Sequence, residues 1–191
     1  MSDLKLILGD YDQFFKIIFK HLENTGIKEI DQYEVDHLCY RVTSEAMYQQ
    51  KKIELSKVGD LLTETMINGR PISVFKLNNP IQYQNRLIPA IELPCPKPIS
   101  HHVQGLEHME MVINCDFDSM RSKYSHIDWV LAGINKSFNA DLEIEFTLSQ
   151  QDKLDLQYPP STYNEKRTIS VKFHHLPLEK VVEIEKQQGT K

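Results

Sequence analysis

The chain has 191 residues and a formal net charge of −5 at pH 7, and its 40% hydrophobic and 26% charged residues are ordinary for a globular protein. This length suits one domain or two small fused modules with a substantial core. The acidic balance argues against a nucleic-acid-binding protein, which needs a basic surface to displace counterions. No run of about 18 apolar residues is present, so no membrane-spanning helix is predicted.

The amino terminus and the cysteines indicate the cellular compartment. The first residues lack the basic leader and long apolar stretch of a secretory signal. The three cysteines, Cys39, Cys95 and Cys115, are odd in number and have no CxxC spacing, which favours free thiols in a reducing compartment. We therefore expect a cytoplasmic protein, a monomer or a homodimer, without nucleic-acid or membrane partners.

The first predicted element is an amphipathic helix over residues 10–25. Asp10 can cap its start, aromatic and aliphatic residues recur at helical spacing, and Gly26 can end it. Because this helix precedes the repeated part of the sequence, we assign residues 1–30 to an added N-terminal helical extension.

An acid–histidine pair then opens two strand-like stretches, Asp36-His37 in the first and Glu107-His108 in the second. Each stretch is followed by a helical pattern that ends near a glycine, Gly59 or Gly133. Internal repetition of this kind predicts a duplicated structural unit. We expect two copies of a βα-then-strands unit, each with one histidine on its first strand.

The two predicted modules cover residues 31–96 and 105–176, and a helical tail covers 177–191. An Asn-Gly dipeptide at Asn68-Gly69 favours a hairpin in the first module. The first module is predicted to contain strand 36–42, helix 44–58 and strands 60–66, 71–77 and 87–93. The second is predicted to contain strand 107–113, helix 117–132, strand 142–148, a polar loop over 150–166 and strand 167–174.

Strand alternation indicates which side chains can meet. His37 shares a face with Cys39 and Arg41, and His108 shares a face with Glu110. Glu92 is a lone acid within an apolar strand, where an unpaired carboxylate is costly. Two imidazoles and one carboxylate form the ligand set of a divalent-metal site with open positions. The last strand offers Lys172 and His174 on one face.

Other interpretations of these residues stay open. His37 and His108 can instead bond the neighbouring acids, and Glu92 can pair with an arginine. Arg41 and Arg70 could hold an anionic substrate, since a guanidinium suits carboxylate or phosphate. Glu110 could be an alternative ligand, a general base or an exposed acid. His101-His102 lies in a proline-flanked loop and is interpreted as solvated or part of a lid.

The motif Met66-Ile67-Asn68-Gly69-Arg70-Pro71-Ile72 resembles the signature of the bacterial YecM family. Ile91-Glu92-Leu93-Pro94, Glu107-His108 and Lys172-Phe173-His174 resemble it in the same order, and the resemblance covers about residues 30 to 185. That family is grouped with the vicinal oxygen chelate superfamily of glyoxalase I, extradiol dioxygenases and antibiotic-resistance proteins. The resemblance implies an α+β fold of two βαβββ modules that form a curved mixed-sheet cleft.

The resemblance also implies a function and a ligand set. His37, Glu92 and His108 match the superfamily's metal ligands, whereas the fourth, a glutamate on the last strand, has only Lys172 or His174 in its place. The implied protein holds one divalent ion (Zn, Ni, Mn or Fe) and acts on a small, oxygen-rich metabolite, as an isomerase, lyase or oxidoreductase. The alternative is a non-catalytic ligand-binding or metal-free interaction domain.

Overall fold

The computed structural model describes residues 3–98, 103–136 and 138–188, so His101-His102 lies outside the described residues. No helix in these ranges is long and apolar enough to cross a membrane. The described helices are α1 (Asp3–Leu8), α2 (Tyr11–Asn24), α3 (Glu45–Leu55), α4 (Phe117–Lys123), α5 (Gln150–Asp155) and α6 (Leu178–Gln188), with 3₁₀ turns at Ile30–Gln32 and Pro160–Thr162. The strands are β1 (Glu34–Arg41), β2 (Gly59–Ile67), β3 (Arg70–Tyr83), β4 (Arg86–Pro94), β5 (Gly105–Val112), β6 (Leu142–Thr147) and β7 (Thr168–His174).

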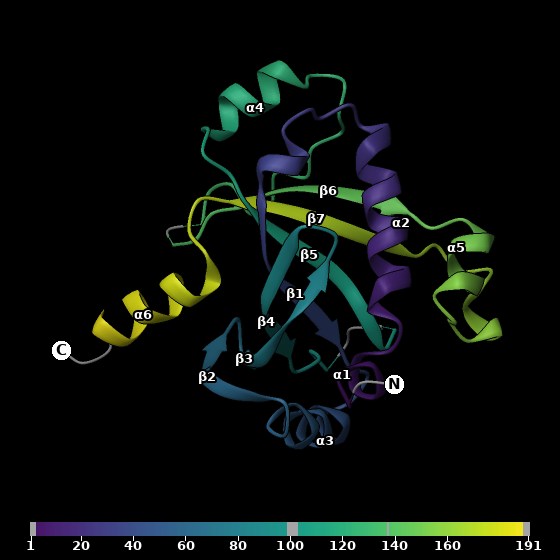
Figure 1. The fold of residues 1–191 in the computed structure, drawn as a ribbon, viewed down its shortest axis with the longest axis vertical. Helices are drawn as coiled ribbons and strands as arrows, with labels where there is room; N and C mark the ends of the chain where they lie inside the picture. Colours follow the sequence, from purple (N-terminus) through teal and green to yellow (C-terminus); the bar gives the residue numbers. More distant parts are fainter. Residues whose placement is uncertain (1–2, 99–102, 137, 189–191) are drawn as a thin grey trace.

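The strands form one mixed sheet in the order β2-β3-β4-β1-β5-β7-β6 (Figure 1). The first strands of the two predicted repeats, β1 and β5, lie side by side and antiparallel in the middle of the sheet. Each then pairs in parallel with the last strand of its own repeat, β1 with β4 and β5 with β7. The predicted α+β fold with a mixed, open sheet is confirmed.

The main core lies between the sheet and α2. Asp10 caps this helix by accepting from the Gln13 backbone N–H at 3.2 Å, as the sequence predicts. Phe15, Ile18 and Leu22 are fully buried and belong to the same apolar cluster as Leu38 and Met109 of the central strands. Because side chains alternate along a strand, the neighbours of Leu38 and Met109 face the other side of the sheet.

The predicted helix over 117–132 is wrong beyond Lys123. Tyr124 is tied elsewhere: its hydroxyl donates to Glu29 and accepts from the Lys28 N–H, and its carbonyl accepts from the Trp129 indole at 3.2 Å. The chain then extends, and Val130 forms an isolated antiparallel bridge with Glu143 of β6. In the second repeat this single bridge stands where the first repeat has a full strand.

The polar segment 150–166 is not entirely a loop as predicted, because it begins with α5. Ser149 and Asp152 cap this helix reciprocally: each side chain accepts from the other residue's backbone N–H, at 3.1 and 2.9 Å. The pattern Ser-x-x-Asp was a readable signal for a helix start.

Two glycine-related predictions have different outcomes. Asn68 and Gly69 have φ values of 51° and 80°, which suits the tight hairpin predicted between β2 and β3. Gly59 was expected to end a helix, but it begins β2, where an added Cβ would lie 2.5 Å from the Lys76 carbonyl oxygen. Its lack of a side chain therefore permits a close approach of two strands.

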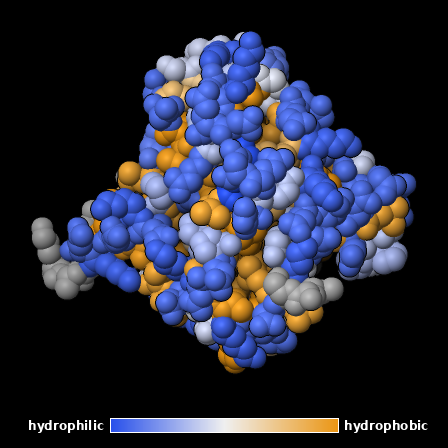
Figure 2. All heavy atoms as spheres, viewed as in Figure 1, coloured by the Kyte–Doolittle hydropathy of each residue, from blue (hydrophilic) through white to orange (hydrophobic). Residues whose placement is uncertain are grey.

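The surface seen in Figure 2 is mostly hydrophilic, with smaller groups of apolar side chains spread over this face. The exposed large apolar residues of the described chain include Leu6, Ile53, Met66 and Leu87. They come from different elements, and single exposed apolar residues are normal on globular proteins.

Candidate metal centre

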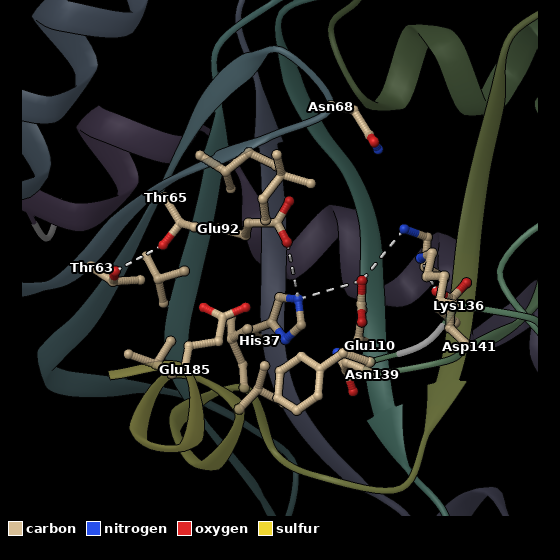
Figure 3. A pocket seen from close by; sticks show the side chains of 18 of the residues that line it. His37, Thr63, Thr65, Asn68, Glu92, Glu110, Lys136, Asn139, Asp141 and Glu185 are labelled. Carbon is tan, nitrogen blue, oxygen red and sulfur yellow. Dashed lines mark hydrogen bonds and ion pairs between the residues drawn. The ribbon is translucent and has the colours of Figure 1, made fainter. Parts of the chain in front are cut away.

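A cavity of about 450 Å³ lies on the sheet face opposite the main core. Strands from both repeats line it, together with α6 and with Lys136, Phe138, Asn139 and Asp141. Figure 3 shows His37 between the carboxylates of Glu92 and Glu110 inside this cavity. His108 and Lys172 line the same space.

The antiparallel pairing of β1 and β5 brings these side chains together. His37 lies opposite Glu110, Leu38 opposite Met109, and Cys39 opposite His108. A local two-fold axis therefore passes near Leu38 and Met109. This axis relates the two histidines. His37 lies opposite Glu110, two residues after His108, and His108 lies opposite Cys39, two residues after His37.

A β-bulge in each central strand explains the duplicated acid–histidine pair. The strand register skips Asp36 and Glu107 and shifts at both places. A bulge re-aims side chains locally, and each acid bonds the histidine that follows it. Asp36 Oδ2 is 3.0 Å from His37 Nδ1, and Glu107 Oε1 is 3.2 Å from His108 Nδ1. Both Nε2 atoms are left for the cavity, as in metal-binding histidines held by a carboxylate.

His37 Nε2 is buried and has no hydrogen-bond partner in the described structure. It lies 3.5 Å from Glu110 Oε1 and 3.9 Å from Glu92 Oε2. Burial lowers the pKa of His37, but the charges of Asp36 and Glu110 outweigh it and raise the pKa well above its ordinary value. The ring nitrogen is therefore held in a strongly negative environment that suits a cation.

Glu110 lies between the two histidines. Its Oε1 is 3.3 Å from His108 Nε2 as well as 3.5 Å from His37 Nε2, and the residue is only 5% exposed. Burial raises its pKa, but the charges of His37 and Lys172 hold it well below the ordinary range. Glu110 is thus an ionised carboxylate, and its position is more central than strand alternation alone indicated.

Glu92 completes the cluster from β4. Its Oε1 accepts from the Cys39 thiol at 3.8 Å, and no ion pair between Glu92 and an arginine occurs in the described ranges. Glu92 belongs to two groups of side chains that could bind a metal ion, and in each group the ligand atoms lie within 4.8 Å of one another. These groups are His37, Glu92 and Glu110, and Cys39, Glu92 and His108.

Lys172 and His174, the two candidates of the last strand, have different surroundings. Lys172 Nζ is 3.4 Å from Glu110 Oε1 and 3.4 Å from His108 Nε2. Burial lowers its pKa, but Glu110 and Glu92 raise it overall, so the side chain is an ammonium. His174 is fully buried behind the cavity, where its Nε2 is 2.9 Å from Asp36 Oδ1 and its Nδ1 is 3.3 Å from Asn139 Oδ1.

Asp36 supports the site from behind rather than lining the cavity. It is bonded to His37, to His174 and, at 2.7 Å, to the Leu178 backbone N–H at the start of α6. Burial raises the pKa of Asp36, but His37 and His174 lower it to about 2. Asp36, His37 and His174 also form a metal-capable group, but these bonds already use both carboxylate oxygens.

Arg41 and Arg70 line the same cavity. Arg41 Nε donates to Glu107 Oε1 at 2.6 Å, and Arg70 Nη1 donates to the Cys95 carbonyl at 3.2 Å. The alternative in which either arginine pairs with Glu92 has no ion pair to support it among the described side chains.

Sequence reasoning missed two parts of the cavity wall. One consists of Lys136, Phe138, Asn139 and Asp141, of which Lys136 and Asp141 form an ion pair. The other is α6, whose Val181 and Val182 pack with Val74 in a small apolar cluster. The helical spacing of Leu178, Val181 and Val182 could be recognised in the sequence, but nothing there indicated which surface they cover.

Two known proteins match parts of this chain in sequence. A 35% identical uncharacterized protein of Haemophilus influenzae matches over 99 residues, and Protein YecM of Escherichia coli is 29% identical over 123 residues. These matches span 52% of this chain and 52% of the first relative, and 64% and 65% for the second, so the chain spans about half to two thirds of these relatives.

Solved structures extend the comparison to the whole fold. A structural-genomics protein, EC4020, has a TM-score of 0.70 at 25% identity, over 97% of this chain and 94% of its own. A Streptomyces coelicolor methylmalonyl-CoA epimerase reaches a TM-score of only 0.41 at 10% identity, over 73% and 96%. The model of the YecM protein family matches residues 3–185, and the chain belongs to this family.

Proposed function

We propose that the cavity holds one divalent metal ion and binds a small, oxygen-rich metabolite. His37, Glu92 and His108 are the proposed metal ligands, and Glu110 is the further carboxylate beside them. The observation that carries this proposal is the buried, unpartnered Nε2 of His37, aimed at two carboxylates. A buried polar atom almost always has a partner, so an orphan in a polar cavity needs one.

The donor set fits a divalent ion. Two imidazoles fixed through Nδ1 and two carboxylates form a nitrogen and oxygen environment that suits Zn, Ni, Mn or Fe, without selecting among them. The cluster also resembles, in residue type and strand position, the ligand set implied for the vicinal oxygen chelate superfamily. Cys39 adds a softer donor beside Glu92 and His108.

A bound divalent ion would supply Lewis acidity that polarises an oxygen of the bound molecule. The chain's own residues orient the two histidine ligands and balance the negative charge of the carboxylates. Asp36 and Glu107 fix the two imidazole rings, and the Lys172 ammonium adds a positive charge beside Glu110. Val181 and Val182 line part of the cavity with apolar side chains. Turnover assays on small diketones, hemithioacetals and catechols distinguish an enzyme from a binding protein.

A second candidate, a metal-free binding domain, is favoured by Lys172. Its ammonium lies where the superfamily places a carboxylate, and it already contacts Glu110 and His108. In this case Lys172 itself would be the cation of the cluster.

Metal content separates the two candidates. Protein purified without chelator is analysed for elements, then stripped and titrated with Mn²⁺ and Zn²⁺. We expect one ion per chain and a loss of affinity of about 100-fold or more in His37→Gln. His126→Gln is the matched control, because His126 is an exposed histidine that contacts the Thr25 carbonyl. Substoichiometric binding, or equal affinities in the two variants, would favour the metal-free domain.

A further inference from the structure

Two guanidinium groups with unused donors line the candidate metal centre. The Arg41 side chain is 12% exposed, and its Nη1 is buried without a hydrogen-bond partner. Arg70 Nε is likewise buried without a partner. Buried donors almost always have a hydrogen-bond acceptor. Two guanidinium N–H donors without one, in the wall of the same cavity, therefore indicate that a ligand supplies the acceptor.

Arg70 has no carboxylate at ion-pair distance in the part of the chain that the structure describes, and its one hydrogen bond is to the neutral Cys95 carbonyl. Burial lowers the pKa of Arg70, and the like charge of Arg41 lowers it further. Holding two cations together in a partly buried place is unfavourable unless an anion joins them. Planar guanidinium groups bind the oxygens of carboxylate and phosphate with two parallel hydrogen bonds.

We infer that Arg41 and Arg70 form an oxyanion subsite, which binds a carboxylate or phosphate group of the same small molecule that the metal centre holds. This inference rests on the proposed function and deepens it. It assigns the ligand to small metabolites that carry neighbouring oxygens at one end and an oxyanion at the other. The cavity of about 450 Å³ is of a size that suits a small molecule.

The position of Glu92 keeps the two subsites distinct. Glu92 acts on both arginines electrostatically, favouring their charged forms, while its Oε2 faces His37. A ligand oxyanion at the arginines would therefore lie beside Glu92 and experience its repulsion when no metal is bound. Removal of this negative charge should strengthen anion binding and weaken metal binding, which is an opposite effect on the two subsites.

The test uses stripped protein in chelator, with inorganic phosphate and malonate as probes in calorimetric titrations. Arg70→Gln should weaken binding of the preferred probe by about tenfold or more, the effect of losing a charged hydrogen-bonded pair. Arg70→Lys should lie between, because it keeps the charge but loses the fork. Lys136→Gln is the matched control: it removes one positive charge from the same cavity, but that charge is paired with Asp141. The affinity of Lys136→Gln for phosphate or malonate should stay within about threefold of the wild-type value, because the effect of a screened charge is small.

Glu92→Gln separates this inference from the proposed function. We expect weaker Mn²⁺ binding together with unchanged or tighter phosphate or malonate binding. If neither probe binds, or if Arg70→Gln binds them as wild type does, the inference is wrong, whatever the metal titration shows. An equal loss in Lys136→Gln would also overturn it. If the probes bind through Arg70 but no metal binds, the oxyanion subsite stands and the proposed metal function fails. Circular dichroism and melting curves establish that each variant is folded.

Discussion

Glu92 and Lys172 occupy equivalent positions in the two halves of the sheet. Glu92 lies opposite Cys39 in the parallel pair β1–β4, and Lys172 lies opposite Glu110 in the parallel pair β5–β7. Cys39 and Glu110 each follow a cavity histidine by two residues. The two halves thus agree in geometry and carry opposite charges at this position, and Glu110 brings the second carboxylate from the neighbouring strand.

This relationship predicts that Lys172 opposes metal binding. Lys172→Met removes an ammonium group 3.4 Å from both Glu110 and His108. Because a unit charge at such a distance contributes about 4 kcal/mol even in a moderately polar environment, metal affinity should rise by roughly tenfold or more. Titration of the stripped protein with Mn²⁺ measures this directly.

The same variant should lose stability in chelator, because the buried Glu110 loses one of the two positive charges that hold its pKa low and keeps only that of His37, at a cost of up to about 3–5 kcal/mol. Added metal should restore much of that loss. A variant that binds metal more weakly than wild type would contradict the prediction and assign Lys172 a role in holding the ligands in place.

Asp36→Asn should affect both the site and the fold. The amide has one accepting oxygen, whereas Asp36 meets three donors from His37, His174 and the Leu178 backbone. We expect the free energy of unfolding to fall by roughly 3–5 kcal/mol. The metal affinity should fall by roughly 10- to 100-fold. Glu107→Gln is the matched comparison, since Glu107 bonds His108 but is 28% exposed, and it should cost less stability. Denaturant unfolding of both variants measures the two losses of stability. An equal loss in Asp36→Asn and Glu107→Gln would contradict this prediction.

Asp36 also predicts a pH dependence. Its pKa is lowered to about 2 in the folded protein, so the stability it contributes is present above the ordinary carboxyl range and is lost as pH falls through about 2. The difference in free energy of unfolding between wild type and Asp36→Asn, measured in chelator, should therefore shrink from about pH 4 toward pH 2. A difference that stays constant over this range would mean that the carboxylate charge does not stabilise the fold.

The sequence was sufficient to predict the face on which the site lies, but not its exact pairing. The repeated acid–histidine pair predicted that β1 and β5 are related strands. Alternation predicted only that His37 shares a face with Cys39 and Arg41 on one strand, and that His108 shares a face with Glu110 on the other. The register could not be predicted, because it shifts at two bulges on either side of the pair Leu38 and Met109, and an alternation pattern does not reveal them. As a result Glu110, which remained one of several candidates in the sequence, lies between the two histidines.

Bulges and long-range contacts explain the other differences. The register shifts at Asp36 and Glu107 leave no mark in an apolar–polar pattern, yet they direct both acids onto the histidines. Similarly, the helical spacing after Phe117 is real, but Tyr124 is held by Glu29 and Lys28, which lie far away in sequence. Local propensity is a weak guide where such contacts compete with it.

Gly59→Ala tests the close approach of β2 and β3. The new Cβ would lie 2.5 Å from the Lys76 carbonyl oxygen, a backbone atom that can move only with its strand. We expect a loss of about 1–3 kcal/mol in stability, typical of overpacking. Asp60→Ala at the next, exposed position is the control and should change stability by less than about 0.5 kcal/mol. Equal melting temperatures for the two variants would show that the strands can separate without cost.

Glu92→Gln distinguishes a metal ligand from a structural ion pair. The substitution keeps the volume and polarity of the side chain but removes its charge, so metal affinity should fall strongly. In excess chelator the melting temperature should change little or rise. No arginine lies at ion-pair distance from Glu92 among the described residues, so the loss of its weaker attraction to Arg41 and Arg70 is offset by the relieved cost of desolvating the carboxylate. If Glu92 instead formed a buried pair with Arg41 or Arg70, the same change would leave that arginine without its counter-charge and destabilise the protein by roughly 3–5 kcal/mol. A large loss of stability without metal would therefore remove Glu92 from the ligand set, whereas neutrality together with weakened Mn²⁺ binding would support its place there.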